Sequence, residues 1–555
     1  MSTEPALQSL QNTLKENCYR DVGGFFRYFE DQSWSATVQN ILHRPETADL
    51  VEELSASLWD LRRLDAMDEW FATFQSLFFA ADHPTVRLRS EPIITSSSSY
   101  QASIRIGSHH LSAATGSTRI YGEYHHGAAP ISSTDDDDFL RFAERALRVF
   151  NAQPARYFLH AFLIRGKTLE LWVFDRSGAY SSGVLDIARD PNLPLRVLAG
   201  YGMMSDQESG MNMLIKSLCP GEGYSILPDR IPKLFLQPKT IVAPDYLVGR
   251  GTVCFAASAS AATEPTIVVK FSWRVDTTPV ELRVLERARD RKVWGVLRLL
   301  ECKDLVNVAD LRHGLDFPRL YVNRTLSCVI TEPLGRPIRQ FVSLYELLEV
   351  FRDLVKALKS LYMDGSILHR DIAIKNLVIA TKYNEDTSEG ILIDFDLALD
   401  LDEAPAVQQM VGSDGFMAIG ILSGQPHTYR HDLESLFYVF LWLAIGNDCE
   451  HDHAHEILQT LPKTSRLWKW CSMDFNDVRQ AKVADMSPDG FEHILNEFSA
   501  RFAPLRGLAT ELHRLIFPIR DGGIFTKTET DQAAVERLYQ GMVDAFNHSI
   551  LALKD

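Results

Sequence analysis

The amino-acid sequence predicts an α+β fold made of several domains, and three observations support that class. The chain has 555 residues, more than one hydrophobic core usually organises, so about two to four domains are expected. Short apolar and β-branched runs alternate with turn residues between residues 246 and 331, which is typical of strands. Apolar residues at helical spacing instead dominate roughly the last 120 residues. A β-rich region should therefore precede a mainly helical one.

Residues 1–135 are expected to form a mainly helical N-terminal region. The segments 50–64 and 65–79 both carry apolar residues at helical spacing. Residues 91–134 are rich in Ser, Gly and His, which predicts a loop with one strand, at 102–106.

Residues 136–240 are expected to form an α+β region. Apolar positions in 139–150 recur at helical spacing, and the acidic run 135–138 can complement the N-terminus of that helix. A metal site at the four carboxylates is the alternative, and it needs ligands from elsewhere in the chain. The apolar runs 157–164 and 168–174 are joined by Arg-Gly-Lys, which predicts a β-hairpin.

A connection and a small β-rich region should follow. Five prolines between residues 219 and 245 predict the connection into the next domain. In residues 241–335, apolar and β-branched runs predict a helix at 279–289 and strands at 246–248, 253–257, 266–271 and 329–331.

Residues 336–555 are expected to form a larger, mainly helical region. Ser343 and Glu346 match a capping box that opens a helix with apolar positions as far as residue 361. Gly365 is placed to end that helix. Two short strands are expected after it, at 377–380 and 391–393.

Composition and charge exclude several classes of protein. The formal net charge of −16 argues against a general nucleic-acid binder, which needs a basic face. The apolar run 436–445 is about half as long as a membrane span, so it predicts a buried helix and no membrane association. Residues 1–18 lack the apolar core of a secretory signal. The seven cysteines are scattered without a C-x-x-C pair, which favours reduced thiols in an intracellular setting, cytoplasmic or nuclear.

Two short segments in the second half of the chain carry residues typical of one chemistry. Residues 368–376 read Leu-His-Arg-Asp-Ile-Ala-Ile-Lys-Asn, and residues 391–396 read Ile-Leu-Ile-Asp-Phe-Asp. Both segments resemble a protein kinase, the first its catalytic loop and the second its metal-binding turn. The spacing from Asp371 to Asn376, and the apolar strand that ends at Asp394, make a chance match a poor explanation.

The resemblance implies a role for each polar residue of the two segments. Asp371 would accept or orient the proton of the acceptor hydroxyl. Asn376 and Asp394 would hold magnesium, because amide and carboxylate oxygens suit that ion. His369 would pack and hydrogen-bond to hold the loop, and Arg370 would pair with a phosphorylated residue where one exists.

A second set of residues would hold the nucleotide. Gly249 and Gly251 lie between two expected strands, and glycines let a hairpin approach phosphates closely, although a plain tight turn fits the same residues. Lys270 ends a Val-Val-Lys run, where a lysine would pair with the α- and β-phosphates of ATP. Glu281 is the expected ion-pair partner of this lysine, with Glu286 as the alternative. The bend that begins at Glu332 is assigned to the same nucleotide site.

Within the protein-kinase superfamily, the chain resembles the fungal-type protein kinase family. The matching segments are Glu332-Pro333-Leu334-Gly335-Arg336-Pro337, Asp394-Phe395-Asp396, His431-Asp432-Leu433-Glu434-Ser435 and Trp172-Val173-Phe174-Asp175-Arg176-Ser177-Gly178. The superfamily resemblance covers about residues 246–445, and the family resemblance extends back to roughly residue 140. It implies a bilobal kinase fold, with a small β-rich lobe and a large helical lobe. It also implies the use of ATP and magnesium and a protein substrate phosphorylated on Ser or Thr.

Three residues depart from the usual kinase pattern. Ala373 replaces the lysine two residues after Asp371, and Lys375 could reach the γ-phosphate instead. Asp396 replaces a glycine, and its Cβ restricts positive φ, so the turn should not flip readily to an inactive form. Gly420 replaces a glutamate, which removes a salt bridge of the large lobe.

The segment after the metal-binding turn also differs. Residues 397–411 contain no Ser, Thr or Tyr, so Arg370 has no phosphorylated partner there. Our hypothesis is that an acidic residue of this segment takes that place and keeps it ordered, the candidates being Asp400, Asp402 and Glu403. Ser413 stands where Ser/Thr kinases have a threonine, whereas Ala373 and Lys375 are more like the pattern of tyrosine kinases. Ser/Thr substrates are favoured over Tyr, because a short hydroxyl nucleophile needs no room for a ring.

Several alternatives remain open from the sequence. A pseudokinase that binds nucleotide as a scaffold would explain Ala373, Asp396 and Gly420, and a small-molecule phosphotransferase is a further competitor that Arg370 argues against. The alternating histidines of 451–456 could bind zinc or form a polar loop, and the pairs at 109–110 and 125–126 resemble them. Cys254 could be redox-sensitive or a small packing residue. The oligomeric state is left open.

Overall fold

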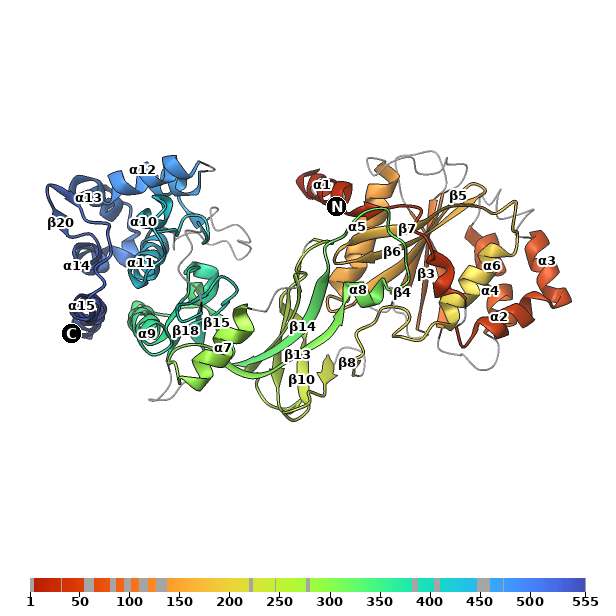
Figure 1. The fold of residues 1–555 in the computed structure, drawn as a ribbon, viewed down its shortest axis with the longest axis horizontal. Helices are drawn as coiled ribbons and strands as arrows, with labels where there is room; N and C mark the ends of the chain where they lie inside the picture. Colours follow the sequence, from red (N-terminus) through yellow and green to blue (C-terminus); the bar gives the residue numbers. More distant parts are fainter. Residues whose placement is uncertain are drawn as a thin grey trace. The chain divides into compact units, whose positions relative to one another are not determined.

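The computed structural model forms two compact units, and the chain crosses between them several times (Figure 1). The first unit comprises residues 1–263, 269–277 and 303–329, and the second comprises 264–268, 278–302 and 330–555. The structure describes residues 4–30, 32–53, 64–79, 86–93, 101–108, 118–125, 137–218, 223–244, 246–275, 280–381, 388–403, 410–446, 460–472 and 474–554.

The first unit contains a seven-stranded mixed sheet with the order β1-β7-β6-β5-β4-β3-β2. Neighbours are antiparallel except for the parallel pairs β4–β5 and β1–β7. The strands are β1 (Cys18–Tyr19), β2 (Val86–Pro92), β3 (Gln101–Ser108), β4 (Thr118–His125), β5 (Phe158–Arg165), β6 (Thr168–Asp175) and β7 (Gly178–Asp186).

Helices cover both faces of this sheet, as alternation along β6 shows (Figure 1). Leu171 and Val173 pack into one core, while Trp172 and Phe174 pack into the other, because successive strand residues point to opposite faces. One core includes residues of α1 (Glu4–Asn17) and α5 (Asp137–Ala152). The other includes residues of α2 (Ser35–Leu42), α3 (Pro45–Glu53), α4 (Leu64–Phe78) and α6 (Leu193–Met203), along with the short helical turn Phe25–Tyr28.

The sequence predicted this region in part. The helix at 139–150 and the hairpin at 157–174 are confirmed as α5 and as β5 with β6. The prediction of a loop with one strand over 91–134 is wrong, because β3 and β4 both lie there and β2 runs into it. The apolar residues of these strands pack against helices that are distant in sequence. The alternation of apolar residues within the segment was therefore a weak signal for strands.

A second seven-stranded sheet has the order β13-β14-β12-β11-β10-β9-β8. Its strands are β8 (Ile215–Ser217), β9 (Tyr224–Ile226), β10 (Leu234–Val242), β11 (Val253–Ser258), β12 (Ile267–Val275), β13 (Arg298–Asn307) and β14 (Arg324–Glu332). The short helix α8 (Val308–Leu311) lies in the connection between β13 and β14. The expected connection at 219–245 therefore carries β9 and β10, which extend this sheet.

The predicted strand at 246–248 is also wrong. Residues 246–252 belong to the loop that leads into β11, and they include Gly249 and Gly251 at positive φ. Leu247 is buried in the core that contains α5, with Val248 packed against it. Packing against that core, rather than strand pairing, buries the apolar residues that suggested a strand.

The second unit is mainly helical. Its helices are α7 (Val280–Asp290), α9 (Leu344–Met363), α10 (Ile419–Leu422), α11 (Tyr429–Gly446), α12 (Phe475–Asp485), α13 (Pro488–Asn496), α14 (Arg506–Ile516) and α15 (Gln532–Ala552). Short strands form three small sheets: β15 (Gly335–Pro337) with β17 (Leu377–Ala380) and β18 (Gly390–Leu392), β16 (Ile367–Leu368) with β19 (Leu399–Asp400), and β20 (Ile519–Arg520) with β21 (Gly523–Ile524).

Two predicted helices organise this unit. The Ser343 hydroxyl caps α9 by accepting from the Glu346 amide at 3.1 Å, as the capping box predicted. Every residue of α11 is buried, which confirms a buried helix at 436–445. Among the described residues, no helix is long and apolar enough to cross a membrane.

Candidate active site

The catalytic-loop segment follows β16 and is held by one carboxylate. Asp432, in the first turn of α11, accepts hydrogen bonds from the amides of His369 at 2.9 Å and Arg370 at 3.0 Å. The Asp432 side chain is buried, and burial raises its pKa above the usual value. A buried carboxylate that accepts two amides fixes the backbone of the loop, which the positive φ of Arg370 helps to bend.

His369 joins this loop to the metal-binding turn. Its Nδ1 accepts from the Asp371 amide at 3.3 Å, so its Nε2 carries the proton and donates to the Ile393 carbonyl at 3.1 Å. The ring also packs against Phe395, with 5.0 Å between ring centroids. These contacts support the structural role predicted for His369.

Asp371 has both carboxylate oxygens engaged. The Ser413 hydroxyl donates to Oδ1 at 2.7 Å, and the Asn376 amide nitrogen donates to Oδ2 at 2.9 Å. The same amide donates to the Asp371 carbonyl at 2.8 Å, which leaves the amide oxygen as the atom able to bind a metal. Lys375 lies 3.7 Å from Oδ2 with its side chain half exposed. The carboxylate is therefore oriented from both sides.

The metal-binding turn brings three carboxylates together. Oxygens of Glu281, Asp394 and Asp396 all lie within 4.8 Å of one another. Carboxylate oxygens suit a hard ion such as magnesium. The three carboxylates therefore fit the implied metal. Asn376 lies beside them in the chain fold, because its backbone carbonyl accepts from the amide of Ile393, next to Asp394, at 3.1 Å. Asp394 has positive φ, whereas Asp396 does not.

The segment after Ser413 is anchored by two side chains distant in sequence. The Glu434 carboxylate accepts from the Ile419 amide at 2.7 Å and from Arg430 at 2.6 Å. Lys482, on α12, donates to the carbonyls of Gly415 at 2.9 Å and Met417 at 2.7 Å. Both charged side chains are fully buried.

A side chain at position 420 would require neighbouring side chains to shift. A Cβ on Gly420 would lie 2.3 Å from His431 Nε2. Glu434 and Lys482 anchor the same stretch of chain from its amide and carbonyl groups. They hold the stretch of chain in which the sequence indicated the loss of a salt bridge.

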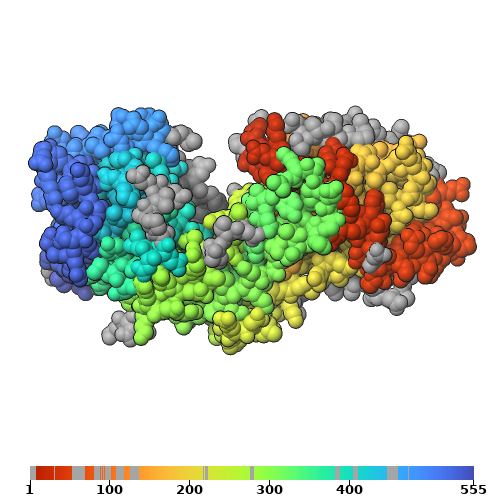
Figure 2. All heavy atoms as spheres, viewed as in Figure 1, coloured from red at the N-terminus to blue at the C-terminus, as the bar shows by residue number. Residues whose placement is uncertain are grey.

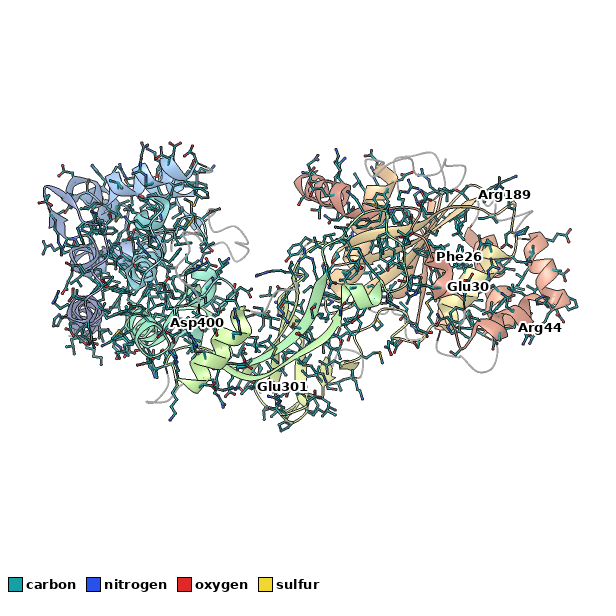
Figure 3. The ribbon with its side chains drawn as sticks, in the orientation of Figure 1. Phe26, Glu30, Arg44, Arg189, Glu301 and Asp400 are labelled. Carbon is teal, nitrogen blue, oxygen red and sulfur yellow. The ribbon has the colours of Figure 1, made fainter. Side chains whose placement is uncertain are left out.

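The acidic residues after the turn pair with α7 and not with Arg370, so that hypothesis is wrong. Asp400, labelled in Figure 3, contacts Arg287, and that residue lies on α7. The other two acids pair with neighbouring arginines, Glu403 with Arg283 at 2.8 Å and Asp402 with Arg291 at 2.7 Å. The three arginines are spaced four residues apart, which places them along one side of the helix and its end. The interpretation failed because α7 lies far away in sequence.

The predicted nucleotide residues are divided between the two units. The first unit contains Gly249, Gly251 and Lys270, the last of which lies on β12. The second unit contains Glu281 and Glu332. The pairing of Lys270 with Glu281 stays a prediction. Glu332 forms an ion pair with Arg298 and is linked to Pro333 by a cis peptide bond.

Other candidate sites have ordinary structural partners or lie outside the described residues. Asp138, in the first turn of α5, pairs with Arg165 at 2.8 Å, and His125 is buried 2.7 Å from Glu123. Cys254, on β11, is half-buried. The described part of the chain does not include Asp135, Asp136 or the histidines at 109–110, 126 and 451–455.

Sequence reasoning missed two residues near these elements. Lys482 has no local signal, since a lysine on a helix is usually solvated. Arg176 was noted only as part of a family motif, yet its buried guanidinium donates to the Tyr246 carbonyl at 2.7 Å, beside the glycine turn 249–251.

The fold and these contacts agree with what comparison of the sequence with known protein families finds. The model of the fungal protein kinase family matches residues 118–444, which is more than half of the chain and includes the first sheet from β4 onward. A search of curated protein sequences found no match. The fold is thus kinase-like α+β, with an additional α+β region before it, and the chain belongs to the fungal protein kinase family.

Proposed function

We propose that the chain is an ATP- and magnesium-dependent protein kinase that transfers the γ-phosphoryl group to protein hydroxyls, with Ser and Thr favoured. One observation carries this proposal. The Asp371 carboxylate is oriented by Ser413 on one oxygen and by Asn376 on the other, in a loop whose backbone Asp432 holds. A side chain so constrained is suited to aim one acceptor hydroxyl, which is what phosphoryl transfer requires of a protein.

The proposed reaction follows from these positions. The acceptor oxygen forms a bond to the γ-phosphorus while the bond to the β–γ bridging oxygen breaks and ADP leaves. The hydroxyl proton passes to Asp371. A magnesium ion held by Asn376 and Asp394 would neutralise charge on the phosphates. Lys375 and Lys270 would screen the remaining phosphate charge, with Glu281 orienting Lys270.

Protein substrates are the proposed partners, in an intracellular setting, cytoplasmic or nuclear. The net charge of −16 disfavours nucleic acid, and the free thiols of Cys18 and Cys471 agree with reducing conditions. A serine at position 413 in contact with Asp371 supports Ser/Thr over Tyr substrates.

A labelled-ATP assay with magnesium tests the proposal. Wild type should phosphorylate a mixed protein substrate, and Asp371→Asn should lose at least about a hundredfold in rate, because it removes the proton acceptor. Asp544→Asn, on the exposed face of α15, is the matched control and should be unchanged. Phosphoamino-acid analysis should show phosphoserine and phosphothreonine. Transfer that persists in Asp371→Asn would contradict the assignment.

A pseudokinase is the second candidate, and Ala373 favours it. This alanine occupies the usual lysine position and is fully buried, so it offers no charge to the phosphates. In that case nucleotide would raise the melting temperature of wild type without any transfer. Asp371→Asn would then leave the nucleotide-induced shift unaltered.

A further inference from the structure

The turn between β6 and β7 holds the glycine turn within the first unit. The Gly249 amide donates to the Arg176 carbonyl at 2.9 Å. In the other direction, Arg176 Nη1 donates to the carbonyls of Tyr246 at 2.7 Å and Leu247 at 3.2 Å. One residue of the N-terminal sheet therefore binds the glycine loop through both its backbone and its side chain.

The guanidinium also fills the space that a side chain at residue 251 would need. A Cβ built on Gly251 would lie 2.5 Å from Arg176 Nε and 2.8 Å from its Cζ. Gly251 has φ of +49°, a conformation that side chains disfavour as well. The glycine turn thus packs directly onto Arg176, and its shape depends on this contact.

Arg176 is an unusual choice for a purely structural contact. The side chain is fully buried over the ring of Phe150, and burial lowers its pKa to about 10. Its Nε and Nη2 meet no acceptor among the described residues. A buried cation with N–H groups lacking acceptors is costly, and an apolar residue would pack there at lower cost. We infer that Arg176 is kept at this position because it fixes the geometry of the glycine turn 249–251.

Asp175, the residue before Arg176, links the same turn to the connection between β13 and β14. Asp175 forms a bidentate, fully buried ion pair with Arg312, which follows α8 in the β13–β14 connection. The Arg312 guanidinium is enclosed by four aromatic rings, Tyr19, Tyr180, Phe317 and Tyr321. This connection also pairs with the N-terminal segment at Gly23 and Asp316, and Figure 2 shows its green surface against the red N-terminal residues.

We propose that Arg176 is a positioning residue for nucleotide binding, through which the N-terminal sheet holds the glycine turn 249–251 in a preformed shape. This inference rests on the proposed function, which assigns that turn to the phosphates. A phosphate-binding hairpin that is already ordered loses less conformational freedom when nucleotide binds. The N-terminal region is thereby part of the nucleotide-binding machinery.

Steady-state kinetics on the full chain separate positioning from general stability. Arg176→Met keeps the length of the side chain but removes the charge and the donors. It should raise KM for ATP about tenfold to a hundredfold, with a smaller change in kcat and none in KM for the protein substrate. Arg176→Lys should recover part of the loss. Arg189→Met, at a highly exposed position (Figure 3), is the matched control and should behave as wild type.

A second variant keeps the proposal testable if Arg176→Met fails to fold. Gly251→Ala leaves the N-terminal core intact and should raise KM for ATP through the clash with the guanidinium. Lysine lacks the planar guanidinium group. The double variant Arg176→Lys/Gly251→Ala should therefore raise KM for ATP by less than the product of the increases caused by the two single changes. The strain of positive φ is common to both backgrounds and cancels in this cycle.

The possible outcomes decide between the two proposals. If wild type binds and uses ATP but Arg176→Met keeps its KM, or if the cycle is additive, Arg176 has no positioning role while the kinase proposal stands. If wild type shows neither nucleotide binding nor transfer, the proposed function fails and the role of Arg176 fails with it. A rise in KM for ATP that Arg176→Lys partly reverses supports both.

Discussion

The glycine turn and the catalytic loop are both held by buried ions, but the two ions have opposite charge. Arg176 binds the first through its carbonyls, and Asp432 binds the second through its amides. A buried charge contributes strongly to the local potential, because protein screens it less than water does. The cation thus lies beside the turn proposed to meet phosphates, and the anion lies beneath the loop proposed to hold magnesium. Each buried ion favours the ligand proposed for its loop.

The largest expected effect comes from breaking the buried ion pair of Asp175 with Arg312, next to Arg176 in the turn between β6 and β7. Arg312→Ala leaves Asp175 as an uncompensated buried charge and should lower the free energy of unfolding by about 3–5 kcal/mol. Unfolding in denaturant measures this change in the free energy of unfolding. The double variant Asp175→Ala/Arg312→Met should recover part of the loss. A loss no larger than that of the control Arg189→Met would show that the pair does not brace the turn.

The catalytic loop should respond differently from the glycine turn. Asp432→Ala removes the acceptor of two amides, and we expect kcat to fall about tenfold to a hundredfold with little change in KM for ATP. Asp432→Asn keeps one acceptor oxygen and should be intermediate. Paired with Arg176→Met, this comparison separates a kcat effect from a KM effect. Equal changes in both parameters for both variants would remove the distinction.

Lys482 tests whether a buried cation also holds carbonyls in the second unit. Burial lowers its pKa from 10.5 to about 7, so between those values the unfolded chain binds more protons than the folded one. The free energy of unfolding should therefore rise as pH increases from 7 to 9, by about 2 kcal/mol relative to Lys482→Met. Melting curves of both proteins at several pH values measure this. Parallel pH profiles would show that Lys482 titrates normally.

The smallest expected effect concerns the exposed ion pairs of α7. Arg283 and Glu403 are both nearly half exposed, so Arg283→Gln should lower the free energy of unfolding by less than about 1 kcal/mol. Raising the salt concentration from about 0.05 to 0.5 M should abolish that difference, since exposed charges are screened. The effect of Arg312→Ala should persist at high salt, because its partner is buried. Melting temperatures at both salt concentrations compare the two variants.

The sequence predicted the features that depend on residues close together in the chain. The spacing of Asp371 and Asn376, the capping box of α9 and the hairpin of β5 and β6 all lie within short segments, and the structure has each of them. Short spacing limits how a segment can fold, so the pattern carries the geometry. The family match to residues 118–444 agrees with the resemblance found in those motifs.

Other features were missed because their partners are distant. The acids at 400, 402 and 403 were assigned to Arg370, but α7 and the residue after it supply three arginines more than a hundred residues earlier. The loop at 246–248 resembled a strand because its apolar residues face a core built by α5. Hydrophobicity indicates that a residue is buried, but it does not indicate what buries it.

By itself, the sequence determined the family, the candidate catalytic segment and three helices of the second unit, α7, α9 and α11. Only the tertiary structure decided that Arg176 supports the glycine turn and that Lys482 supports the segment after Ser413. The physical reason is that a charged side chain becomes an anchor only when the fold removes it from water and places backbone acceptors around it. No local pattern records that event, because burial is a property of the whole packed chain.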